Sequence, residues 1–111
     1  MKYVCLVYSD EKKLEDVSDN ECIANAEILK NNGQYVTGEA LQSIQTATTV
    51  RIRNGKLSIT DGPFAETKEQ LAGFYLIDAK DLNEAIQIAS KIPPARVGSI
   101  EVRPVRELRP R

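Results

Sequence analysis

The residues most able to do chemistry in this chain gather in one short polar segment, from Asp61 to Gln70. The segment holds three carboxylates, Asp61, Glu66 and Glu69, together with Lys68. Carboxylates and a lysine can exchange protons or hold a ligand, although an unperturbed carboxylate is a weak base at neutral pH. The plainer interpretation is that these are solvated loop charges, with Asp61 bonded to the amides of its own turn. The spacing alone favours that plainer interpretation.

The composition excludes several other chemistries. The chain of 111 residues contains no histidine, which removes histidine-based triads and most zinc sites. The six glycines are scattered among turns and form neither a Walker nor a dinucleotide-binding pattern. Cys5 and Cys22 lack metal-ligand spacing and are typical of small buried hydrophobic side chains. We therefore expect no metal and no cofactor.

Charge and hydropathy also limit the partners. The formal net charge is −1 and the opposite charges are interspersed, which does not favour nucleic acid. No stretch approaches the ~20 apolar residues of a membrane helix, and no secretory signal is evident. We expect a cytoplasmic protein that binds neither nucleic acid nor membrane.

Two helices are predicted from capping signals and apolar spacing. A capping box at Ser18–Glu21, followed by an apolar stripe, predicts a helix over residues 18–32. The same signal at Asp81–Glu84, with a proline stop, predicts a second helix over residues 82–92.

The strands are predicted from alternation. Four are expected, over residues 3–8, 34–38, 71–77 and 99–104. The first and third of these are apolar or aromatic on both alternating faces, which is typical of strands covered on both sides. Residues 50–60 alternate around Asn54-Gly55 and predict a β-hairpin, whose polar face places it toward a sheet edge.

This order of elements predicts an α+β fold. Two β-α-β units with right-handed crossovers give a ferredoxin-like antiparallel sheet with two helices on one face and an extra β-hairpin. We expect one domain over residues 1–104 and a charged C-terminal tail over residues 105–111.

The helices cover one face of that sheet, so the other face stays open. Its projected area is on the order of 300 Å², which reaches the largest apolar patch that a monomer usually tolerates. We therefore expect a homodimer packed through the open sheet face. The alternative, in which the long loops fold back over the sheet, stays open.

The segment from Asp61 to Asp78, DGPFAETKEQLAGFYLID, resembles the signature of the DGPF-domain proteins in the YCII-related family. Further matches to the family pattern lie at residues 1–3, 38–41, 47–51, 92–96 and 99–105. The resemblance covers nearly the whole chain. It implies a ferredoxin-like domain that dimerises into an α+β barrel.

The resemblance implies less about activity. Some YCII-related proteins carry a His-Asp pair in a cleft, but this chain has no histidine, and Asp61 alone does not restore such a mechanism. Other members of the family are linked with extracytoplasmic-function sigma factors, which keeps a regulatory role open.

A ligand site is expected near the mouth of the barrel. Its candidate residues are Tyr8, Asp61, Phe64, Glu66, Lys68 and Arg96. Asp61 is the best candidate for a base or ligand acceptor, Lys68 and Arg96 for anion contacts, and Phe64 and Tyr8 for apolar walls. An acid–base role would require burial to raise the pKa of Asp61 or Glu66.

Three functions remain open from the sequence. The first is a homodimeric small-molecule-binding protein, with or without weak or vestigial enzymatic activity. The second is a non-catalytic regulatory or interaction module, such as a partner of an extracytoplasmic-function sigma factor system. The third is purely structural, with the segment at residues 61–70 turning sharply to seal the dimer.

Overall fold

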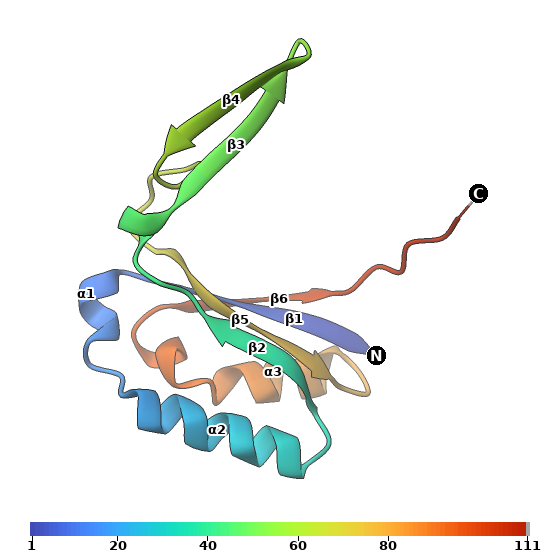
Figure 1. Cartoon of the computed structure of the whole chain (residues 1–111). Coiled ribbons are helices and arrows are strands. Elements are labelled where there is room, and N and C mark those ends of the chain that lie inside the picture. The colour runs from blue at the N-terminus through green and yellow to red at the C-terminus, as the bar shows by residue number, and fades with distance from the viewer. Residues whose placement is uncertain (111) are drawn as a thin grey trace.

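The computed structural model describes residues 1–110 and has an α+β architecture (Figure 1). The main sheet is antiparallel and has the strand order β2-β5-β1-β6. Its strands are β1 (Lys2–Ser9), β2 (Tyr35–Ala40), β5 (Gln70–Asp78) and β6 (Ser99–Pro104). Helices α2 (Asp19–Asn31) and α3 (Leu82–Ser90) lie on the same face of this sheet. Strand order and direction are those of a ferredoxin-like fold, as the sequence predicts.

The helix ends follow the capping signals closely. Ser18 caps α2 and forms the predicted capping box with Glu21. Helix α3 ends at Ser90, two residues before its predicted end, and a short 3₁₀ helix, η2 (Pro93–Arg96), follows it. Two further short elements, α1 (Glu11–Leu14) and η1 (Ile44–Thr46), were not expected from the sequence.

The core lies between the two long helices and the sheet. Alternate residues of β1, namely Tyr3, Cys5 and Val7, are buried there with Ile77 of β5. Burial raises the pKa of the Cys5 thiol to about 11, so that this cysteine stays protonated and unreactive at neutral pH. The expectation of a buried Cys5 is confirmed.

The other face of the sheet has an apolar centre and a polar rim. Strand register places Leu6 opposite Phe74, on the face that points away from the helices. On the outer strands the same register places Glu101 of β6 and Glu39 of β2 on this face. Within residues 1–110 no helix covers it (Figure 1). The predicted two-faced character of the central strands is therefore confirmed.

The hairpin does not lie at the edge of this sheet, and that prediction was wrong. Strands β3 (Thr48–Arg53) and β4 (Lys56–Asp61) form a separate two-stranded sheet that projects from the side of the open face (Figure 1). The base of the hairpin closes on itself, because Gly62 N donates to Ala47 O and Thr49 Oγ1 donates to Gly62 O. The alternating pattern predicted the pairing of β3 with β4, but it did not indicate whether a third strand pairs with either of them.

We call β3 and β4 with their turn the hairpin arm (residues 48–61). Its four apolar side chains share one face and are each 60–66% exposed, namely Val50, Ile52, Leu57 and Ile59. The radius of gyration is 15.8 Å, against about 13 Å for a compact chain of this length, and both the arm and the segment after β6 extend away from the sheet (Figure 1). Beyond β6, residues 105–110 have no regular secondary structure, and Arg111 of the predicted tail lies outside the described residues.

Gly98 permits the close approach of the η2–β6 connection to β1. A Cβ atom at this position would collide with the carbonyl oxygen of Tyr8 and lie 2.9 Å from Cβ of Ser9. We therefore expect Gly98→Ala to lower the free energy of unfolding by about 3 kcal/mol in equilibrium denaturation. Gly33→Ala is the control, because its Cβ meets no atom and only its φ of 70° is strained, at a cost of about 1 kcal/mol. Equal losses in the two variants would contradict this account.

Candidate functional site

A cavity of about 550 Å³ lies between the base of the hairpin arm and the start of β5. We call it the hairpin-base cavity. Its apolar lining comes from Leu41, Ile44, Pro63, Phe64 and Leu71. Polar side chains from the end of β1, the β2–β3 connection and the loop at residues 62–69 complete it. The volume lies in the range of small-molecule sites.

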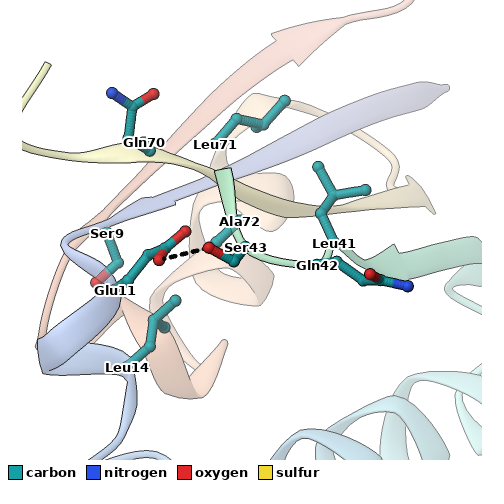
Figure 2. Close-up of a pocket in the computed structure, with 9 residues that line it drawn as sticks. All are labelled: Ser9, Glu11, Leu14, Leu41, Gln42, Ser43, Gln70, Leu71 and Ala72. Carbon is teal, nitrogen blue, oxygen red and sulfur yellow. Dashed lines mark hydrogen bonds between the residues drawn. The ribbon is translucent and has the colours of Figure 1, made fainter. Parts of the chain in front are cut away.

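A smaller cavity of about 210 Å³ adjoins the first one (Figure 2). The residues that line both are Leu41, Gln42, Ser43, Gln70 and Leu71. Glu11, the first residue of α1, points at the shared wall. One of its carboxylate oxygens accepts from Ile44 N at 2.7 Å, and the other accepts from Ser43 Oγ at 3.0 Å. Glu11 thereby fixes the β2–β3 connection that forms one side of the hairpin-base cavity.

The opposite side is a loop held by its own hydrogen bonds. Gln70 Nε2 donates to the carbonyl oxygens of Ala65 at 3.2 Å and Thr67 at 2.8 Å. Gly62 has a φ of 100°, which starts the turn predicted from Asp-Gly-Pro. Phe64 is 78% exposed, so it does not anchor the loop to the core but forms part of the cavity wall.

The structure brings together some of the candidate residues and separates others. Tyr8 and Phe64 line the hairpin-base cavity. Asp61, Glu66 and Lys68 are exposed and lie outside the lining that residues 1–110 provide. Their proposed roles stay predictions.

Arg96 has a structural partner elsewhere. Its Nη2 donates to Glu21 Oε2 at 2.9 Å, which joins η2 to the first turn of α2. This hydrogen bond holds the pKa of the Glu21 carboxyl below its usual range. Arg96 is thus directed toward α2 rather than toward the loop at residues 61–70.

No sequence pattern indicated Glu11 or Ser43 as parts of the site, and Gln70 stood out only as the last residue of the polar segment at residues 61–70. Glu11 meets Ser43 across 32 positions of the chain, and no local pattern encodes such a contact. Among the residues that the structure describes, no three cysteine or carboxylate side chains are placed to hold a metal ion. The described helices include none long and apolar enough to span a membrane.

The fold and the cavity define the class of protein, a ferredoxin-like α+β domain with a projecting hairpin arm and a small-molecule-sized cavity at its base. Comparison with known proteins gives the family. Residues 1–109 match the model of the YCII-related domain. An uncharacterized protein of Rhizobium meliloti (strain 1021) is 36% identical in an alignment over 122 residues. The alignment covers 99% of this chain and 96% of that relative. The chain therefore belongs to the YCII-related family, as its sequence indicates. Its place among the DGPF-domain proteins stays a prediction.

The role of Glu11 leads to a test. We expect Glu11→Ala to speed amide hydrogen exchange at Ile44 by about tenfold or more, because a charge-assisted hydrogen bond contributes about 1.5–3 kcal/mol. Glu15→Ala is the matched control, since Glu15 is exposed at the end of the same short helix. Exchange can be followed by NMR. Unchanged exchange at Ile44 in the Glu11 variant would contradict the assignment.

Proposed function

We propose that this protein is a homodimer that binds a small molecule in the hairpin-base cavity. The observation that carries the proposal is the cavity itself, in which an aromatic wall and several polar groups converge in a ligand-sized volume. Tyr8 and Phe64 serve as walls. Asp61, Glu66 and Lys68 belong to the end of the arm and the loop that holds Phe64, and they would act at the rim. Arg96, being joined to Glu21, is left out of the proposed site.

The open sheet face supports the dimer. Apolar side chains of β1 and β5, such as Leu6 and Phe74, occupy its centre, and charged residues of β2 and β6 surround them. An apolar centre with a polar rim is the usual anatomy of a protein interface. Four strands of six to nine residues give this face a projected area on the order of 400 Å².

The hairpin arm adds to the same surface. Its apolar face contributes roughly 200 Å² more in projection, whereas a stable interface buries about 800 Å² of accessible surface on each partner. The sheet face and the arm together come closer to that area than either does alone. An isolated two-stranded hairpin is also marginally stable in water, so cover from a second copy explains the four exposed apolar side chains on one side of the arm. Two sheet faces stacked in this way would give the α+β barrel that the family resemblance implies.

The dimer can be tested by light scattering at micromolar concentration. We expect twice the chain mass of 12.3 kDa for the wild type and a single chain mass for Leu6→Lys, because the new charge would be buried without a partner. Ile86→Lys is the control, since Ile86 lies on α3 and is 49% exposed. A wild-type protein of single chain mass would overturn the proposed dimer. The open face would then be available to a different protein, as in the alternative of a regulatory or interaction module.

The ligand can be tested with Phe64. We expect at least one member of a panel of neutral, anionic and cationic metabolites to raise the Tm of the wild type. Phe64→Ala should weaken that binding by about tenfold, through loss of an aromatic contact worth roughly 1.4 kcal/mol. Leu108→Ala is the control, because Leu108 is equally exposed, at 80%, but lies near the C-terminus. If Phe64→Ala does not weaken the binding, or if no metabolite binds, the assignment of the cavity is overturned.

A further inference from the structure

We infer that the hairpin-base cavity takes an uncharged ligand, which carries hydroxyl or amide N–H groups on an aromatic or aliphatic body. The inference rests on the proposed function, since it names the ligand class for the same site. Three observations support it: the charge of the lining, the hydrogen-bonding capacity left in it, and its apolar wall.

The lining carries no formal charge. Among residues 1–110, no aspartate, glutamate, lysine or arginine contributes to it. A carboxylate or ammonium group that leaves water for a site without an opposite charge loses far more solvation free energy than a neutral polar group does. Glu69, the carboxylate next to Gln70 in the loop, accepts from Ser99 Oγ at 2.8 Å and is tied to β6 instead.

Three of the four threonines of the lining donate their hydroxyl hydrogens to the backbone, the fourth being Thr48. Thr46 Oγ1 donates to Ser43 O at 2.7 Å, and Thr49 Oγ1 donates to Gly62 O at 2.8 Å. Thr67 Oγ1 donates to Glu69 O at 2.6 Å. A hydroxyl that has donated its single hydrogen can only accept further hydrogen bonds.

Two more polar groups are committed in the same way. Ser43 Oγ donates to Glu11, and the two hydrogens of Gln70 Nε2 go to Ala65 O and Thr67 O. What Ser43 and Gln70 have left to offer a ligand is therefore oxygen acceptors. Because the side chains of these three threonines, Ser43 and Gln70 offer acceptors only, their part of the lining favours a ligand that brings its own hydrogen-bond donors, whereas Gln42 and Thr48 add donors of their own. An ammonium group would also bring donors, but the Glu11 carboxylate behind the shared wall already accepts from Ser43 Oγ and Ile44 N and is not part of the lining.

The hydroxyl of Tyr8 can form a hydrogen bond with an oxygen atom of such a ligand. Within the described chain its hydroxyl makes no hydrogen bond that would commit it, and its side chain lines the cavity at the end of β1. A hydroxyl of this kind can both donate and accept. A ligand hydroxyl beside Tyr8 could therefore either donate a hydrogen bond to the Tyr8 oxygen or accept one from the Tyr8 hydroxyl.

The apolar wall of the cavity indicates that the ligand has an aromatic or aliphatic part. Phe64 stands largely in solvent although it is a large apolar side chain, with Leu41, Ile44 and Leu71 in the same lining. An aromatic or aliphatic group placed against it would remove this surface from water, and aromatic pairs gain further from stacking.

Four matched probes test the inference by titration calorimetry at pH 7. These are phenylbutanol, its methyl ether, phenylbutyrate and phenylbutylamine, which share one body and differ in charge or in the donor. We expect the Kd of phenylbutanol to be at least tenfold lower than that of either charged probe. The methyl ether keeps the oxygen but loses the hydrogen, so its Kd should be about threefold higher or more.

Two variants link the result to the cavity. Tyr8→Phe should raise the Kd of phenylbutanol by about threefold or more, whereas Tyr3→Phe, which removes a hydroxyl on the helix-covered face, should leave it unchanged. A charged probe that binds as tightly as the alcohol, an ether that binds equally well, or no binding of phenylbutanol at millimolar concentration would overturn the ligand class. The proposed function would survive each of these outcomes if a charged metabolite of the panel still bound in a Phe64-dependent way.

Discussion

Two helices cover only one face of a sheet whose central strands are apolar on both faces. Helices α2 and α3 bury Tyr3, Cys5 and Val7 of β1, and the intervening residues of the strand point the other way. Covering those residues would contribute roughly 25 cal/mol for each Å² of apolar surface removed from water. The sheet thus carries the buried core on its helix side and an uncovered apolar surface on its open side.

The hairpin arm and the cavity follow from how the chain leaves this sheet. After β2 the chain is held by Glu11 through Ile44 and Ser43, and before β5 it is held by Gln70. These contacts hold the two connections on either side of the arm base, and β3 and β4 pair with each other and not with the sheet. The space left between the two connections is the hairpin-base cavity. Its shape depends on a few polar contacts at its edges rather than on a packed core.

Local patterns predicted the fold well, because its elements are encoded by neighbouring residues. The capping box at Ser18 gave the start of α2, and Asn54-Gly55 gave the turn of the hairpin, with φ angles of 53° and 75°. The position of the arm was not predictable in this way, since it depends on contacts between segments distant in sequence. Glu11 is the clearest case, because nothing near it in the chain indicates that its carboxylate binds the amide of Ile44.

The residues of the candidate site were also harder to predict than the fold, for a chemical reason. Sequence reasoning selects residues by type and so favoured charged groups, yet the exposed position of Asp61 and the pairing of Arg96 with Glu21 leave the cavity with a neutral lining. Charged side chains are well solvated at loop surfaces, and it is their removal from water that requires a partner. Tyr8 connects this site with the open face, because it lines the cavity and alternates with Leu6 along β1. A second copy seated on that face would contact the strand that ends in the cavity, so that dimerisation and ligand binding would each change the free energy of the other.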